Sequence, residues 1–297
     1  QKIDDFKQLR EYGREGEDSI TDAMLKDSGS GSGAFVALPK DIDLPEGVGE
    51  EPANTVTFDT SGPMQFDVTY RLGTGTDVWT GFALFSGATP VGRSVAYGNL
   101  PTSHEVTHAS FIANVVAGVP YTLRLGRRDS GFTTHTPTPI GGQAMPSLAV
   151  VATPVDPAAH AQLDGPGQVF PAGWTPIDLS EGSVGVGISA SGSDVTFSEA
   201  GVYRIAVGYR NGVGADTWTG VRVVDDEGAV VGVSTGYGND VNTVDLQAVQ
   251  FLADIASPGV YHIELGRLGA SLTVASAADI VGVAMPSIVA VVTRVEP

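Results

Sequence analysis

The chain contains an internal repeat, which constrains its fold more than any other feature of the sequence. The segment TVTFDTSGPMQFDVTYRLGTGTDVWTG, beginning at Thr55, matches DVTFSEAGVYRIAVGYRNGVGADTWTG, beginning at Asp194. Identical residues lie 139 positions apart as far as the two Trp-Thr-Gly motifs, and 140 positions apart from Tyr97-Gly98-Asn99 onward. A match of this length with one single-residue change of offset indicates a tandem duplication of one domain.

Each copy has the length of a complete domain and the pattern of a β protein. Short apolar runs alternate with Gly, Pro, Asn and Asp, and the 297 residues include 39 Gly and 18 Pro. In YHIELGRL the apolar Tyr261, Ile263 and Leu265 alternate with polar residues, as in a half-buried strand. VRVVDDEGAVVGV predicts a hairpin around the turn at 225–228. We therefore expect an all-β chain of two tandem β-sandwich or jelly-roll domains.

The first 33 residues differ from the rest and predict a short helical N-terminal segment. Ile3, Phe6 and Leu9 recur at helical spacing within residues 2–27, and the Gly/Ser run at 28–33 is typical of a flexible linker. Such a segment could dock the chain onto another protein, or it could be a disordered terminus without a role. The expected boundaries are 1–33, 34–155 for domain 1 and 156–297 for domain 2, with a linker over residues 155–165.

The composition excludes several classes of partner. The formal net charge is -18, with 16 Lys and Arg against 34 Asp and Glu, which argues against nucleic acid as a partner. There is no Cys and hence no disulfide framework. No apolar run approaches the roughly 20 residues of a membrane-spanning helix, so no membrane insertion is expected. The chain opens with Gln1 and not Met, which leaves open whether a signal peptide precedes it.

The second copy carries a resemblance to a known family. FSEAGVYRIAVGYR (197–210), the upstream GWTPIDLSEGSVGVGIS and the closing IVAVVTRV resemble the tumour-necrosis-factor-like and complement-globular-head-like jelly rolls. The resemblance covers most of 160–297. It reaches 34–155 only through the repeat, because Pro63 and Met64 replace the Val and Tyr of the turn. It implies a jelly-roll fold, a role in recognition and a homotrimer, whose contact would use the apolar stretch Ala284 to Val292.

Domains of this kind also occur at the tips of phage fibres and spikes and on gene-transfer particles. An acidic, Cys-free chain with a helical tag resembles that version. The resemblance implies a virion or virus-like particle surface protein, a head spike or tail fibre, held to a particle base or capsid protein through residues 2–27. Its receptor would be a host-surface polysaccharide. The alternatives are a capsid decoration protein without receptor binding and a free, secreted lectin-like module.

No constellation in the sequence predicts an enzyme, a cofactor or a metal ion. His104 to His108 match HExxH, but zinc proteases need that motif on a helix, and the repeat context predicts strand and loop. The corresponding residues of the second copy, 244–248, include no His. Neither a GxSxG elbow nor a phosphate-binding loop is present. We therefore expect incidental surface histidines and no catalytic residues.

The candidate glycan contacts are aromatic and acidic residues. Both copies contain Asp-x-Trp-Thr-Gly, and an aromatic face beside a carboxylate suits a sugar ring. The alternative is that both tryptophans lie in the core and the aspartates cap turns. An acidic turn in the second copy could contact the receptor or a Ca²⁺ ion, or could be a solvated hairpin tip. The candidates are Asp77, Trp79, Asp216, Trp218, Asp225, Asp226 and Glu227.

Overall fold

The structure is a computed structural model and every element in its described part is a strand, so the chain is all-β. No helix among the described residues is long and apolar enough to cross a membrane. The predicted helical segment and linker at 1–33 lie outside the described residues. The described residues are 34–37, 48–51, 55–71, 79–94, 97–98, 106–127, 148–210, 217–234, 237–239, 246–269, 271–274, 276, 280 and 283–296.

The strands fall into two sets, which we name the N-terminal half (34–154) and the C-terminal half (160–296). The N-terminal half contains β1 (Ala34–Ala37), β2 (Val48–Glu51), β3 (Thr55–Phe58), β4 (Gly62–Arg71), β5 (Trp79–Ser86), β6 (Thr89–Arg93), β7 (Tyr97–Gly98), β8 (Val106–Val115), β9 (Tyr121–Arg127) and β10 (Leu148–Pro154). The C-terminal half contains β11 (His160–Gly165), β12 (Val169–Phe170), β13 (Gly173–Pro176), β14 (Leu179–Val186), β15 (Ile188–Gly192), β16 (Asp194–Phe197), β17 (Gly201–Arg210), β18 (Thr217–Asp225), β19 (Val230–Val233), β20 (Tyr237–Asn239), β21 (Leu246–Ile255), β22 (Gly259–Arg267), β23 (Leu272–Thr273) and β24 (Ile288–Glu296).

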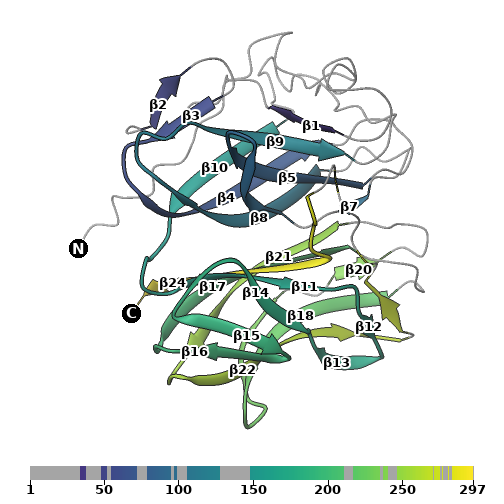
Figure 1. The fold of residues 1–297 in the computed structure, drawn as a ribbon. Coiled ribbons are helices and arrows are strands. Elements are labelled where there is room, and N and C mark those ends of the chain that lie inside the picture. The colour runs from purple at the N-terminus through teal and green to yellow at the C-terminus, as the bar shows by residue number, and fades with distance from the viewer. Residues whose placement is uncertain are drawn as a thin grey trace, which may run out of the picture.

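Each half folds its strands around its own apolar core (Figure 1). In the N-terminal half a seven-stranded sheet containing β5 and β9 packs on a three-stranded sheet in the order β10-β4-β8. In the C-terminal half a hydrogen-bonded path runs from β19 through β22, β15 and β11 to β21, and this sheet folds over on itself. Aromatic rings fill both cores, including a stacked Phe66 and Phe111 and an edge-to-face Phe197 and Tyr203.

Strands at corresponding positions of the sequence repeat have corresponding neighbours. β4 lies between β10 and β8, and β17 lies between β24 and β21. Trp79 pairs with Gly98, as Trp218 pairs with Gly238. Residues matched in the sequence therefore occupy matched places in the sheets.

The predicted linker at 155–165 is wrong over its second part. Residues 160–165 form β11, which pairs with β14 on one side and β24 on the other. A strand between two neighbours and covered on both faces needs no alternation of polar and apolar residues, and HAQLDG shows none. The connection between the halves is thus limited to the few residues between Pro154 and His160.

The stretch Ala284 to Val292 is not the free surface that a contact between chains requires. Val289 and Val291 are 2% and 1% exposed and belong to the core cluster of the N-terminal half. Ala290 and Val292 face the opposite way, into the core of the C-terminal half. Residues 285–292 are therefore buried within one chain, which explains their hydrophobicity without a second copy.

Candidate functional site

The outer face of the C-terminal half exposes an aromatic side chain on β18. Along this strand Thr219, Val221 and Val223 are buried, because they point into the sandwich. The alternate positions point outward, and Trp218 among them is 59% exposed. The alternative that Trp218 lies in the core is therefore wrong.

A second tryptophan, Trp174, lies on the same outer face. Its strand β13 pairs with β22, which places Trp174 opposite Gly266, and the next strand places Gly220 opposite Gly266. A methyl group added to Gly266 would lie 2.5 Å from two atoms of the Trp174 ring. The glycine therefore allows the indole to rest directly on the sheet, where it remains 42% exposed.

The Trp174 ring also contacts an ion pair. The guanidinium carbon of Arg222 lies 4.4 Å from the ring centroid, the geometry of a cation–π contact. The Nε atom of Arg222 donates to the Oε2 atom of Glu264 at 2.6 Å, and the two residues are directly opposite on β18 and β22. We name these four side chains (Trp174, Trp218, Arg222 and Glu264) the outer tryptophan face. Three neighbouring strands fix its geometry.

The corresponding face of the N-terminal half is closed. On β5, Ala83 and Phe85 point outward, yet they are 0% and 5% exposed. They are covered by Ile280, Val283 and Met285, which reach across from the C-terminal half. The segment leading to β24 crosses toward β5 and β7 in Figure 1. On the C-terminal half Trp174 and Trp218 stay exposed, although Val224, the repeat counterpart of Phe85, is itself only 3% exposed.

The acidic turn lies far from the tryptophans. Asp225 ends β18 seven residues after Trp218, about 23 Å away along the strand. Its Oδ1 atom accepts hydrogen bonds from the backbone amides of Glu227 at 3.0 Å and Ala229 at 2.8 Å, so this carboxylate stabilises the turn. Asp226 and Glu227 are exposed at the tip. The structure thus separates Trp218 from the three acidic candidates.

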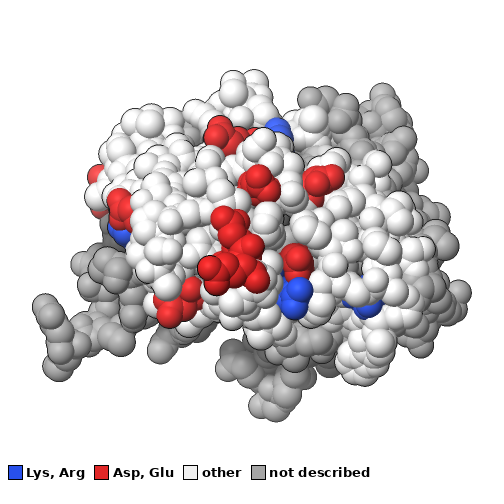
Figure 2. All heavy atoms as spheres, turned by 90° about the horizontal axis from the view of Figure 1, so that it is seen from below, with Lys and Arg blue, Asp and Glu red and all other residues white. Residues whose placement is uncertain are grey.

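No described group of three His, Asp or Glu side chains is arranged to hold a metal ion. Carboxylates are nevertheless frequent at the surface, and on the face shown in Figure 2 they outnumber the basic side chains. Asp77 and Asp216 lie outside the described residues, and Trp79 is placed only by its backbone at the start of β5. The pairing of aspartate and tryptophan within the repeated motif therefore stays a prediction.

The HExxH sequence does not lie on a helix. Its last residue, His108, belongs to strand β8, while His104 and Glu105 lie outside the described residues. The ring nitrogens of His108 lie 3.1 Å from Thr69 Oγ1 and 3.2 Å from Ser110 Oγ. The expected strand context is confirmed for this part of the motif, and the helical spacing that zinc proteases use is not formed there.

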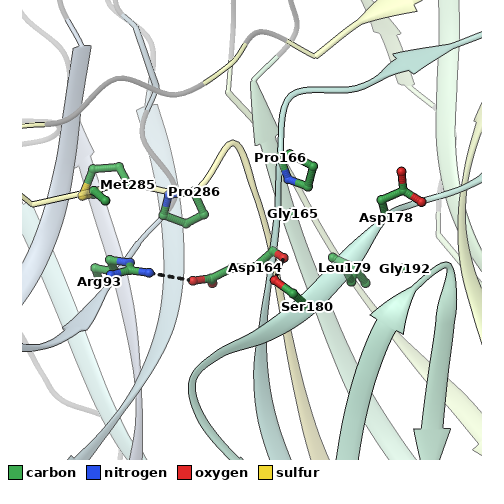
Figure 3. A pocket seen from close by; sticks show the side chains of 11 residues that line it. Arg93, Asp164, Gly165, Pro166, Asp178, Leu179, Ser180, Gly192, Met285 and Pro286 are labelled. Carbon is green, nitrogen blue, oxygen red and sulfur yellow. Dashed lines mark hydrogen bonds and ion pairs between the residues drawn. The ribbon is translucent and has the colours of Figure 1, made fainter.

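A groove of ≈ 610 Å³ lies where the two halves meet (Figure 3). At its floor the Arg93 guanidinium donates to Asp164 at 3.1 Å, and the Gln162 amide donates to the same carboxylate at 3.0 Å. Burial raises the pKa of Asp164, although Gln162 and Arg93 oppose this effect. Since these groups bind one another across the junction, we interpret them as a link between the halves.

Trp174 and its ion pair were missed by sequence reasoning. The exposure of Trp174 depends on Gly266, which lies more than 90 residues away and is adjacent only in the folded sheet. A signal was available: Phe35, 139 positions earlier, also pairs opposite a glycine, Gly126. An aromatic residue recurring at this position of the repeat could have marked it.

No family model matches the chain, and no curated protein matches it. Among solved structures, two mutants of Bacillus subtilis oxalate decarboxylase show a weak similarity to this chain. The first shares 10% identity over 88% of this chain and 80% of that one, with a TM-score of 0.11. The second shares 9% identity over 96% and 78%, also with a TM-score of 0.11. These similarities are too low to support a shared fold or activity.

Proposed function

We propose that this chain is an attachment protein that binds a surface glycan through the outer tryptophan face of its C-terminal half. The observation that carries the proposal is the exposure of Trp174 and Trp218 on one rigid sheet face, at 42% and 59%. Indole rings offer flat apolar surfaces to the C–H faces of sugars, and Glu264 and Arg222 offer an acceptor and donors to hydroxyl groups. The face contains no nucleophile with an adjacent base, so binding explains it better than catalysis.

The rigidity of the face favours recognition. Gly266 and the Arg222–Glu264 pair hold Trp174 in one place before a ligand arrives. A preorganised aromatic ring loses little conformational entropy on binding, which helps a shallow site that buries a small area. Because the chain has a formal net charge of -18, a neutral polysaccharide, or a cationic one, suits this protein better than a polyanion.

The same proposal includes the domain arrangement, the oligomeric state and the anchoring of the chain. We interpret the two halves as tandem jelly rolls from a duplication, which the matched strand neighbours of β4 and β17 support. The resemblance stated for residues 160–297 favours a homotrimer at the surface of a phage-like particle, anchored through residues 2–27. Several copies would raise the avidity of weak glycan sites by roughly 10²–10⁴.

The test is a binding measurement on immobilised neutral polysaccharides and on intact bacterial cells. Trp174→Ala and Trp218→Ala should each weaken binding at least tenfold, while Trp218→Phe, which keeps a ring, should retain most of it. Val116→Ala is the control, since Val116 is 54% exposed on the N-terminal half, away from the face. Wild-type protein that binds no glycan and no cell, or tryptophan variants that bind like wild type, would contradict the proposal. Loss of particle integrity alone on deletion of the protein would favour a decoration role.

A further inference from the structure

Three neighbouring strands of the C-terminal half bring three polar side chains into one row at the junction. β11, β24 and β17 are adjacent in the sheet, and Figure 1 shows them on the side that faces the N-terminal half. His160 on β11 lies directly opposite Thr293 on β24, and Thr293 lies directly opposite Arg204 on β17. Val291, two positions before Thr293, belongs to the core cluster of the N-terminal half, so this row points toward that half. We name His160, Thr293 and Arg204 the polar row.

Each member of the polar row has a buried polar atom without a partner. These atoms are Nε2 of His160, Oγ1 of Thr293 and Nε of Arg204, and none has a hydrogen-bond partner among the described residues. His160 and Thr293 are each only 2% exposed. The large majority of buried polar atoms in proteins are hydrogen-bonded. Three unpartnered atoms in one row therefore indicate a site for a bound polar species.

The protonation of His160 decides which species the row can bind. Its Nδ1 atom lies 2.9 Å from the backbone oxygen of Asp156, and a carbonyl oxygen only accepts, so Nδ1 carries a proton. In the neutral ring Nε2 is then an acceptor, which suits a water molecule and repels an anion. In the protonated ring Nε2 donates, and the row presents three donors, two of them on cations. A species that accepts all three hydrogen bonds and balances this charge is a small anion.

The charged groups around the row leave the Arg204 guanidinium without an acidic partner among the described residues. Arg204 donates to Gln65, a neutral amide of the other half. The acid closest to His160 in the chain is Asp156, which already accepts from Arg294 at 2.8 Å and from the Ala158 amide at 2.9 Å. Arg294 also donates to Glu199, and Val186, opposite His160 on β14, carries no charge.

Burial and an anion act in opposite directions on His160. Burial lowers the pKa of His160, although the carbonyl and the carboxylate of Asp156 oppose this effect. A bound anion beside the ring would favour the protonated form. Proton and anion should therefore bind together, each raising the affinity for the other.

The N-terminal half has a different row at the equivalent place. Gln65 is the repeat counterpart of Arg204, and Thr153 is the counterpart of Thr293; they lie opposite each other on β4 and β10. A neutral amide thus replaces the guanidinium, and it donates to Asp67 at 2.9 Å. The positive charge that an anion needs is present only in the C-terminal row of this pair.

We propose that the polar row is a binding site for a small inorganic anion, which enters together with a proton on His160. The anion accepts from His160 Nε2, Thr293 Oγ1 and Arg204 Nε. Because Arg204 is bonded to Gln65, the anion stabilises the contact between the halves in acid. This site is separate from the outer tryptophan face and does not depend on glycan binding.

The test is urea denaturation of the full chain with chloride as the probe, exchanged for gluconate at constant ionic strength. Measurements at about pH 5 and about pH 8 lie on either side of the ordinary pKa of His, about 6.5. At the lower pH a tenfold rise in chloride should increase the folding equilibrium constant, by up to about tenfold as the site fills. At the higher pH chloride should have no effect. No chloride effect at either pH, as expected for a row that binds only water, would overturn the proposal, and so would equal effects at both.

Variants separate this site from a general effect of chloride. His160→Gln and Arg204→Gln should abolish the chloride dependence. Thr293→Val should weaken it without loss of stability at about pH 8, because it removes only an unpartnered hydroxyl, and it decides the matter if the other two variants fail to fold. His262→Gln is the matched control, since Nδ1 of His262 also faces a backbone oxygen, that of Ser193 at 3.0 Å, but on β22. Chloride dependence that survives in Thr293→Val at full size, or that is lost in His262→Gln, would contradict the site.

Discussion

The two halves of this chain share a repeat and a pattern of strand neighbours, but they expose different surfaces. In the N-terminal half the outer face of β5 is covered by Met285 and its neighbours, and the β8 edge is buried by the other half. In the C-terminal half Trp218, on the outer face of β18, and Leu252, the counterpart of Ile112, are both 59% exposed. The comparison teaches that two halves with matched strand neighbours need to share only their inner residues. Their outer surfaces can then differ.

The sharpest test of the comparison replaces two matched residues, Ile112 on β8 and Leu252 on β21. Ile112→Ala should lower the free energy of unfolding by about 3 kcal/mol, because it opens a cavity at a fully buried site. Leu252→Ala, in dilute protein, should change it by less than about 0.5 kcal/mol, because the side chain is exposed. Urea denaturation measures both. If both variants lost the same free energy of unfolding, the two side chains would not differ in burial, which would contradict the comparison.

A smaller effect is expected from the polar link at the junction. The side chain of Gln162 is fully buried, accepts from the Ile112 amide and donates to the Arg93 carbonyl at 2.9 Å. Gln162→Ala leaves a buried amide without a partner and should cost about 2 kcal/mol in urea denaturation. Gln250→Ala, at an exposed position on β21, is the control and should be neutral. If the two variants had the same free energy of unfolding, the burial of Gln162 at the junction would be contradicted.

Asp164, at the same junction, should make the free energy of unfolding depend on pH. Burial raises the pKa of Asp164, so the folded protein binds this proton more tightly than the unfolded chain does. The contribution of Asp164 to stability therefore falls as the pH rises from about 4, its unfolded value, through the folded pKa. Asp164→Asn should remove this fall. Unfolding free energies measured from pH 4 to 7 in both proteins check the sign, and identical slopes would contradict it.

The smallest change in stability should come from the outer tryptophan face. Gly266→Ala places a methyl where the Trp174 ring now lies, so the ring must move outward. We expect a shift in tryptophan emission and weaker glycan binding with little loss of stability. Gly259→Ala on the same strand is the control, since the new methyl would lie 4.0 Å from a ring carbon of Tyr261, an ordinary van der Waals contact. Unchanged emission in Gly266→Ala would show that the ring does not rest on that glycine.

Local patterns in the sequence predicted the strands well where one face meets water. Tyr261, Ile263 and Leu265 are buried as their alternation predicts, and the predicted hairpin forms between β18 and β19. Residues 160–165 were missed because a strand covered on both faces has no alternation to detect. The alternative that the repeated tryptophans lie in the core failed at Trp218, because recurrence in the sequence does not distinguish a surface position from a core position.

The candidate site and the junction depend on contacts between distant residues. The place of Trp174 is set by Gly266, Arg222 and Glu264 on two other strands, and no local window contains them. The apolar residues of β24 suggested a contact between chains, but β24 presents its second face to the other half of its own chain. Hydrophobicity predicts that a surface is covered, and only the tertiary arrangement shows what covers it.

The most direct measurement of the central claim is hydroxyl-radical footprinting of dilute protein, read by mass spectrometry. The asymmetry predicts fast modification of Trp218 and Leu252 and strong protection of Phe85 and Ile112, in accordance with their exposures of 59%, 59%, 5% and 0%. Adding a bound polysaccharide should then protect Trp218 and leave Leu252 reactive. Comparable modification of Ile112 and Leu252 would contradict the account, because it would show that the two halves expose the same surfaces.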